Sequence, residues 1–490
     1  MSSFRGLSIG ISGLYANKRS LDTISHNIAN ADNPLYVRQQ AIHAESRYSR
    51  ISSNQFVGTG ADVQQIRQIR DEFLDTKIRK EASEFGYWSS RTNVFGQVES
   101  IVRELSEDAL QGVMDKFWGS WEEVAKVPSS LTARGLLRER AIEFVGSVNH
   151  LYNQLESLQH NLDKNVQDMV KEVNGLVKGV AELNTKIMTA EGLGSPANDY
   201  RDTRNGYLDR LSQIMKVEYY TSSNGSVNVV LGGNHMVSDG SFRQLEAKNN
   251  GNPFVDIFWA DSKEKLSEER DIKGGELLGL LYARGSFEQE DNITDVTEYK
   301  YIIPTIKKQL NEYVKGIADA VNELHRQGYT LTGNHDTDFF VKQDLSKSTW
   351  AGNIKISDAI DSLSEIAVSK SFISDIEPRE IGDGKIAEAI AKIRYNGIFN
   401  EGKTTPDNFY RDMITDFGIS ANEAKTMKDS HEMVMNQIDD RRSSLSGVSL
   451  DEEMTEMIKF QHAYNANARL INAIDEMVEQ IVNRMGIVGR

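Results

Sequence analysis

The chain has 490 residues, a formal net charge of −16 and no cysteine. The acidic balance argues against a nucleic-acid partner, because affinity for a phosphate backbone depends on Lys and Arg displacing counterions. The absence of cysteine excludes disulfides, thiolate catalysis and cysteine-ligated zinc sites. No apolar run reaches the roughly 18 residues that a membrane-spanning helix needs, and the N-terminal region lacks a signal-peptide core. We therefore expect no membrane partner and no cleaved signal peptide.

The segment from Ser3 to Ile28 is predicted to be a coiled-coil helix. Every seventh residue is apolar, and further isoleucines widen the stripe: Leu7, Leu14, Leu21 and Ile28, with Ile11 and Ile24 between them. A heptad spacing of this kind keeps one helix face against a partner helix.

Between Asn30 and Asp71 the helical pattern stops. Pro34 and its neighbours predict a turn, and the alternation from Gln55 to Ile66 predicts short strands. This segment is expected to form a small non-helical collar.

Helical periodicity then returns, with three bulky aromatics on one face (Phe117, Trp118 and Trp121) and a long apolar stripe from Leu155 to Ile187. An Asn224-Gly225 pair between β-branched runs predicts a hairpin. Further alternation from Phe254 to Trp259 predicts a small β domain inserted between helices. Helices are expected again over 302–325, 386–393, 409–414 and 421–438.

The segment from Leu450 to Met485 repeats the heptad pattern of the N-terminus. Its stripe consists of Leu450, Met457, Tyr464, Ile471, Val478 and Met485, with Ala468 among the residues between. Ser449 and Glu452 have the spacing of a capping box, which predicts the helix start. A heptad stripe at each terminus indicates that the two ends pair, and that the chain stacks with copies or relatives of itself.

The predicted fold class is mainly α with a small inserted β domain. We expect an elongated multidomain chain with paired N- and C-terminal coiled-coil helices and a long helical bundle. Three domains are predicted: residues 1–75 plus 446–490, residues 76–215 plus 285–445, and the small β-rich domain of residues 216–284.

No coherent active site can be nominated. Gly397 to Thr404 satisfies the P-loop pattern GxxxxGK[ST], but the preceding residues have helical spacing, and Thr405 and Pro406 begin a new helix after the motif. His431 and Glu432 start like a zinc-protease helix, yet Met435 stands where the second histidine is required. The acidic loop around Asp336 could hold a cation weakly, but turn capping is the favoured role. We predict no catalytic residues, no cofactor, no metal site and no enzyme activity.

Residues Ala16 to Gln39, ANKRSLDTISHNIANADNPLYVRQ, resemble the N-terminal signature of bacterial flagellar axial proteins, which are rod, hook and hook-associated subunits. More selective segments resemble the hook-associated protein 1 family of the hook–filament junction: Ser446 to Glu453, Ala197 to Leu211, and Asn322 to Gly333. One departure is Leu35, which stands where the signature has glycine. Leucine avoids positive φ, so a type I turn is expected here.

The resemblance implies a flagellar structural subunit that joins hook to filament as a ring at the hook tip. It implies that the paired terminal helices form an inner tube, with the helical rod domain and the β-rich domain outside it. The implied partners are further copies, the hook protein, a second junction protein on the filament side and an export chaperone at the C-terminus. Export through the flagellar type III apparatus and an extracellular location are also implied. The predicted assembly interface consists of Leu7, Ile11, Leu14, Leu21, Ile28, Asn30, Pro34, Tyr36, Met457, Tyr464, Ala468, Ile471, Val478 and Met485.

Three alternatives remain at this point. Another axial protein, such as a hook or distal rod subunit, is disfavoured by the helical block from Phe85 to Ile187. A nucleotide-binding enzyme would need the P-loop string to be real. A cytoplasmic coiled-coil scaffold would also show the heptad stripes.

Overall fold

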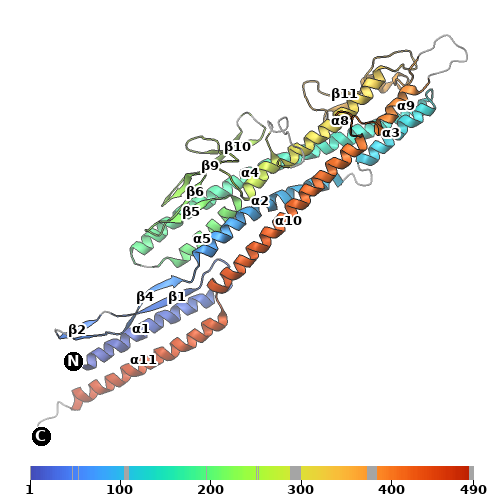
Figure 1. Cartoon of the computed structure of the whole chain (residues 1–490). Helices are drawn as coiled ribbons and strands as arrows, with labels where there is room; N and C mark the ends of the chain where they lie inside the picture. The colour runs from blue at the N-terminus through green and yellow to red at the C-terminus, as the bar shows by residue number, and fades with distance from the viewer. Residues whose placement is uncertain are drawn as a thin grey trace, which may run out of the picture. The chain divides into compact units, whose positions relative to one another are not determined.

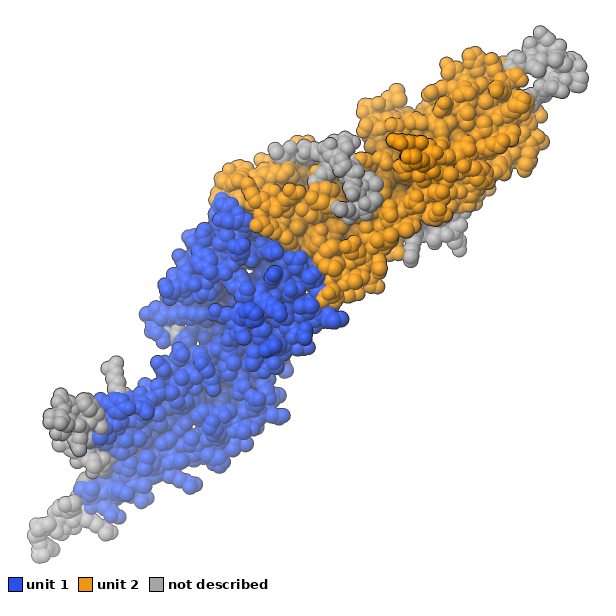
Figure 2. Space-filling model, viewed as in Figure 1, with its two compact units in different colours: residues 1–84, 172–244, 431–490 blue, residues 85–171, 245–430 orange. Residues whose placement is uncertain are grey.

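The computed structural model describes residues 2–46, 48–52, 55–103, 110–194, 196–249, 251, 253–286, 299–371 and 383–484. The chain forms two compact units (Figure 2). Unit 1 consists of residues 1–84, 172–244 and 431–490, and unit 2 of residues 85–171 and 245–430. The mainly helical class with small sheets is confirmed. The division into three domains stays a prediction.

The helices of the described part of the chain include most of those predicted from the sequence (Figure 1). They are α1 (Ser2–Ala29), α2 (Glu72–Arg103), α3 (Leu110–Lys126), α4 (Leu131–Gly192), α5 (Asn198–Ile214), α6 (Gly275–Arg284), α8 (Ile302–Arg326), α9 (Lys385–Lys392), α10 (Pro406–Ser446) and α11 (Leu450–Arg484). The two helices predicted over 409–414 and 421–438 are one continuous helix, α10. Phe417 and Ala424 are both buried on either side of Gly418, so packing carries the helix through a glycine that is intrinsically unfavourable there.

In unit 1, α1 and α11 lie side by side, and α1 also packs on strands β1 (Gln39–Glu45) and β4 (Ala61–Gln68) (Figure 1). These strands are antiparallel, with a register shift between Ile42 and His43. Strands β2 (Ser49–Ser52) and β3 (Gln55–Val57) form a second antiparallel pair. The expectation of short strands in the collar is confirmed.

A four-stranded antiparallel sheet completes unit 1. Its strands are β5 (Glu218–Thr221), β6 (Val227–Leu231), β7 (Asn234–Ser238) and β8 (Ser241–Phe242), in that order. The predicted hairpin is confirmed, because β5 and β6 pair across a turn in which Gly225 has φ of +83°. Such a value favours glycine.

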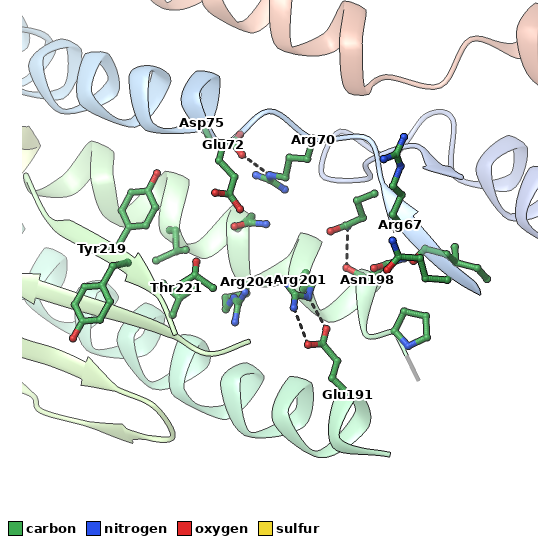
Figure 3. A pocket seen from close by; sticks show the side chains of 18 of the residues that line it. Arg67, Arg70, Glu72, Asp75, Glu191, Asn198, Arg201, Arg204, Tyr219 and Thr221 are labelled. Atoms are coloured by element: carbon green, nitrogen blue, oxygen red, sulfur yellow. Dashed lines mark hydrogen bonds and ion pairs between the residues drawn. The ribbon is translucent and has the colours of Figure 1, made fainter. Parts of the chain in front are cut away.

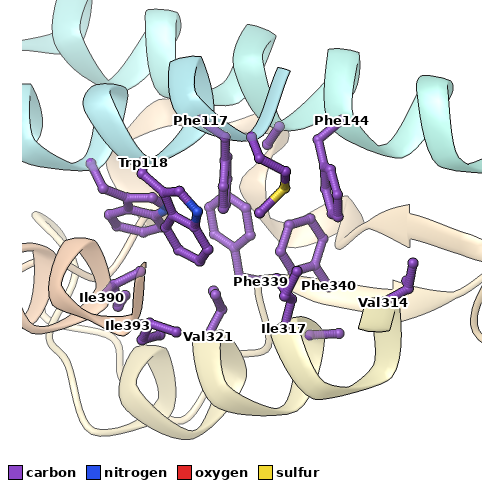
Figure 4. Packing of buried hydrophobic residues seen from close by; sticks show 14 of the residues in the cluster. Phe117, Trp118, Phe144, Val314, Ile317, Val321, Phe339, Phe340, Ile390 and Ile393 are labelled. Atoms are coloured by element: carbon purple, nitrogen blue, oxygen red, sulfur yellow. The ribbon is translucent and has the colours of Figure 1, made fainter. Parts of the chain in front are cut away.

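The described part of unit 2 holds two strand pairs and several helices around one core. Strands β9 (Leu245–Asn249) and β10 (Val255–Trp259) form one hairpin, and β11 (Phe340–Lys342) pairs with β12 (Ile354–Ile356). Three short 3₁₀ segments, Asp358–Asp361, Leu363–Glu365 and Ile393–Tyr395, also belong to it. The core brings α3, α4, α8 and α9 together around Phe117, Phe144, Phe339 and Phe340 (Figure 4).

The P-loop-like string forms a tight turn in unit 2. Backbone bonds between Phe399 and Thr404 close it, and positive φ angles occur at Asn400, Glu401 and Gly402. The ring of Phe399 stacks on Phe409 with centroids 4.4 Å apart. The string precedes α10 as a closed turn between helices, and it lacks the strand-to-helix context that a phosphate cradle requires.

Substituting Phe117→Ala should lower the free energy of unfolding by about 3–5 kcal/mol, because Phe117 is fully buried among other rings. Tryptophan fluorescence in urea would measure this, since all five tryptophans lie in unit 2. Leu345→Ala is the matched control, as Leu345 is 86% exposed. A Phe117 variant as stable as this control would contradict the assignment of the core.

Candidate functional site

The closest contact between the terminal helices uses small residues of α1. A Cβ atom on Gly6 would lie 3.0 Å from Cδ1 of Ile474, and one on Gly10 would lie 3.0 Å from Cγ1 of Ile471. A Cβ atom on Gly13 would lie 2.9 Å from Oδ1 of Asn467. Spacings of four and three residues place these glycines on one helix face. Sequence reasoning missed this glycine stripe, although its spacing is visible in the sequence.

The predicted leucine stripe lies one residue beyond the glycine stripe on α1. Leu7, Leu14, Leu21 and Ile28 are half-buried, and Ile11 is 39% exposed. On α11 the predicted residues Met457, Tyr464, Ala468, Ile471 and Val478 are also half-buried, and Ile471 meets Gly10. Met485 lies outside the described residues. The two helices therefore leave these apolar side chains only partly covered.

Large apolar side chains of the helix pair remain exposed to solvent. They are Ile9, Ile11 and Tyr15 on α1, and Leu450, Met454, Ile458, Leu470, Met477 and Ile481 on α11, which we call the terminal apolar residues. The first three on α11 are spaced by four, so they share one helix face. Exposed apolar side chains gathered on one structural element are typical of an interaction surface.

Asn27 joins both ends of the chain to the collar. Its side chain is 1% exposed. The amide donates to the carbonyl oxygen of Gln39 at 2.9 Å and to Oε2 of Glu453 at 2.9 Å. Its oxygen accepts from the backbone N–H of Gln39 at 3.0 Å and from the hydroxyl of Tyr36 at 2.7 Å. One side chain thus fixes α1, the start of β1 and the start of α11.

Arg38 completes this group, which we call the Asn27 clasp (Asn27, Tyr36, Arg38, Gln39 and Glu453). Its Nε lies 2.6 Å from Oε1 of Glu453, which is 2% exposed. Its other contact, to Oε2 of Glu452 at 2.6 Å, engages the carboxylate that the sequence assigned to a capping box. The backbone N–H of Arg38 donates to the carbonyl oxygen of Ser446 at 2.9 Å. A buried carboxylate needs such partners, because an unpaired one is strongly destabilising.

The phenol of Tyr36 is held in its protonated form. Burial raises its pKa well above the usual range, and the nearby carboxylates of Asp199, Asp202 and Glu453 raise it further. Tyr36 therefore stays a hydrogen-bond donor to Asn27. Of the predicted interface residues near this turn, Tyr36 is the one that enters the clasp. Pro34 is exposed in the turn, and Asn30 is half-buried and bonds the carbonyl of His26 at 2.9 Å.

The turn itself follows the expectation for Leu35. The N–H of Tyr36 donates to the carbonyl of Asn33 at 3.0 Å, and the N–H of Leu35 donates to the side-chain oxygen of Asn33 at 3.1 Å. Among the described residues with positive φ, Leu35 does not occur. Its side chain packs against Gly206, where a Cβ atom would lie 2.9 Å from Cδ2 of Leu35.

The motif at the start of α5 fastens this helix to the collar. Asn198 donates to Oε1 of Gln39 at 3.0 Å and to the carbonyl of Ile66 at 3.1 Å. Asp202 accepts from the backbone N–H of Val37 at 3.3 Å and from Gln68 at 2.6 Å. The sequence does not show that Asp202 fixes α5 to the collar, because its partners Val37 and Gln68 lie more than a hundred residues away along the chain.

Within the described residues, no cluster of three or more His, Asp or Glu side chains could hold a metal ion. Asp338 of the acidic loop pairs with Arg326 at 2.6 Å. No described helix is both long and apolar enough to cross a membrane.

Comparisons with known proteins identify the family. The model of the flagellar hook-associated protein FlgK helical domain matches residues 95–340, which is half of the chain. The chain belongs to the FlgK family. The model of the C-terminal part of flagellar basal body rod FlgEFG proteins matches residues 442–485, which include the whole of α11.

Full-length relatives agree with this family. Flagellar hook-associated protein 1 of Bacillus subtilis is 29% identical over 520 residues, covering 100% of both chains. The protein of the same name from Salmonella typhimurium is 22% identical, covering 96% of this chain and 98% of the relative. The structure of the flagellar hook junction protein FlgK from Burkholderia pseudomallei matches with a TM-score of 0.61 and 14% identity. It covers 76% of this chain and 100% of that chain, and it supports the fold.

The resemblance seen in the sequence is therefore confirmed. The chain is a structural, hook-associated protein of the bacterial flagellum, and it is not an enzyme.

Substituting Asn27→Ala should lower the free energy of unfolding of unit 1 by about 3 kcal/mol, because four buried bonds are lost and Glu453 loses a donor. Circular dichroism in urea, together with limited proteolysis near Ser446, would measure the effect. Asn30→Ala is the matched control in the turn that follows the same helix, and it should change stability by less than about 0.5 kcal/mol. Equal effects from both variants would contradict the clasp.

Burial raises the pKa of Asp202 to about 7, although the Val37 N–H, the Arg70 charge and Gln68 favour ionisation. The unfolded carboxyl titrates near about 3.9, so this group stabilises the fold below that pH, and the stabilisation is lost as pH rises through about 7. The slope is at most about 1.4 kcal/mol per pH unit. Asp202→Asn should remove this slope in thermal unfolding followed by circular dichroism at pH 5 and pH 8. Asp440→Asn, at an exposed carboxylate of α10 that does not act on Asp202, should keep it; a slope unchanged in the Asp202 variant would refute the assignment.

Proposed function

We propose that this chain joins the flagellar hook to the filament, assembling with copies of itself as a ring at the hook tip. The names of its relatives, hook-associated protein 1 and hook junction protein, support this role. The observation that carries it is the exposed set of terminal apolar residues on a helix pair already held together by the glycine stripe and the Asn27 clasp.

Two neighbouring faces of α1 have different contacts: the glycine stripe packs against α11, and the face beside it carries the leucines. Because the glycines form the close contact with α11, the bulky side chains of α1 are only partly covered by that contact within the chain. Leu7, Leu14 and Leu21 remain half-buried beside it. Covering exposed apolar surface contributes about 25 cal/mol per Å². The predicted interface residues on α1 and α11 thus serve contacts with neighbouring subunits.

The proposed partners are those that the family resemblance implies, and the terminal apolar residues are the surface proposed to bind them. One end of the ring contacts the hook protein and the other contacts a second junction protein, while neighbouring copies pair their terminal helices. Export proceeds through the flagellar type III apparatus to an extracellular site. An export chaperone at the C-terminus covers the apolar α11 before assembly, because such a surface otherwise aggregates.

Deleting the gene in its source bacterium tests the role. We expect cells with bare hooks that lose flagellin to the medium, because the filament has no subunit on which to begin. Electron microscopy and an assay of flagellin in the medium would show this. Missing hooks would indicate a rod or hook subunit, and intact motile filaments would refute a junction role.

Complementing this strain with variants tests the surface. Leu14→Asp should fail to restore filaments, because a charge on the apolar stripe opposes burial against a neighbour. Ile471→Asp should fail as well, but its charge also lies against Gly10 of the same chain, so Leu14→Asp is the variant that tests the contact between copies. Leu193→Asp introduces the same charge at a site that is 82% exposed, so it should restore them. The tryptophan fluorescence of all three variants should match the parent, since unit 2 is untouched. Normal filaments on either stripe variant would refute the assigned surface.

A further inference from the structure

Unit 1 contains a cavity of about 930 Å³ with an unusual charge balance (Figure 3). It is bounded by β4, the first turns of α2, the end of α4, α5 and strands β5 and β6. Six arginines line it against three carboxylates: Arg19, Arg67, Arg70, Arg79, Arg201 and Arg204 against Glu72, Asp75 and Glu191. We call it the arginine cavity.

Half of these arginines are already neutralised within unit 1. Arg201 forms a bidentate pair with Glu191, with both distances 2.7 Å. Arg70 pairs with Asp75, and Arg79 pairs with Asp209 at 2.6 Å. These pairs leave a surplus of positive charge on the remaining arginines.

In the described part of the chain, Arg19, Arg67 and Arg204 have no carboxylate partner. Arg67 is exposed and donates to Oε1 of Gln40 at 3.4 Å. Arg19 is exposed on α1. Positive charge in a polar hollow attracts carboxylates, and the attraction is stronger there than on a flat surface.

Arg204 shows that the surplus extends into the wall of the cavity. Its side chain is 2% exposed, and its Nε has no hydrogen-bond partner. Its NH1 donates to Oδ1 of Asn184 and to the carbonyl of Gly225, both at 2.8 Å. Burial lowers its pKa to about 10. A buried guanidinium whose hydrogen-bond acceptors are neutral is costly, and the nearby carboxylate of Glu191 is already paired with Arg201, so a further carboxylate at the cavity would stabilise it.

We propose that the arginine cavity binds an acidic surface segment of a second copy of this chain in the assembled flagellum. This inference rests on the proposed function, which brings copies together. Asp and Glu number 72 against 56 Lys and Arg, so a neighbouring copy carries a surplus of carboxylates. Guanidinium groups bind carboxylates in bidentate geometry. Small-molecule pockets are mostly apolar, whereas charged and amide side chains dominate this lining.

Zero-length cross-linking of isolated flagella tests the proposal. Arg67→Lys keeps the charge and supplies an amine, which a carbodiimide couples to a carboxylate in contact with it. Cells would assemble flagella from a mixture of ¹⁵N-labelled and unlabelled copies, and mass spectrometry would locate the links. Arg441→Lys is the matched control, an exposed arginine on α10 in the same unit.

The expected result is a link from position 67 of one copy to an Asp or Glu of a differently labelled copy, about tenfold more abundant than from position 441. Adding Arg19→Glu, which places a carboxylate at the cavity, should reduce this link. Links only within one copy, links only to the hook protein or another flagellar protein, or no link would each overturn the proposal. Absence of the chain from the isolated flagella would instead refute the proposed function, so the two failures are distinguishable.

Discussion

The side-chain amide of Asn27 is the interaction on which the two ends of the chain depend. Residues more than 420 positions apart meet there, because Asn27 bonds both Gln39 and the buried carboxylate of Glu453. An amide can donate and accept together, so no apolar residue could replace it at this crossing of two helices and a strand. Arg38 and Tyr36 then satisfy the remaining oxygens of the group. The register of α1 against α11 follows from this fixed point.

With α1 and α11 in this register, the glycine stripe occupies the contact between the two helices, and the larger apolar side chains remain partly exposed. Small residues let the helices approach closely and bury little apolar area of their own. The leucines of α1 and the exposed residues of α11 are consequently not used up within the chain. Polar clasp contacts hold unit 1 together, and in the proposed function the exposed apolar surface is the one that meets neighbouring subunits. The contact proposed for the arginine cavity would be a second, electrostatic one in the same unit.

Most elements could be predicted because their signals are local. Heptad spacing predicts α1 and α11, Asn224-Gly225 predicts the β5–β6 hairpin, and Pro406 marks the start of α10. The exceptions have physical causes. The sequence pattern predicts separate helices over 409–414 and 421–438, but α10 runs through Gly418 between them, because burial of Phe417 and Ala424 outweighs the weak helix propensity of glycine. Glu452 has capping-box spacing, yet Arg38 claims its carboxylate, which only the folded chain brings near.

The sequence by itself determined the helical terminal segments, the mainly α class, the absence of cysteine chemistry and the family. The first three properties rest on composition and on spacings of a few residues, and the family rests on the resemblance of segments such as Ala16 to Gln39 to a known signature. Only the tertiary structure decided which face of α1 meets α11 and which arginines of the cavity lack a carboxylate partner. It also decided that Asn27 and Glu453 join the two ends of the chain, and that Asp202 fixes α5 to the collar. Such choices depend on groups separated by more than a hundred residues, and a single sequence contains no local signal of which distant partners will satisfy a buried polar atom.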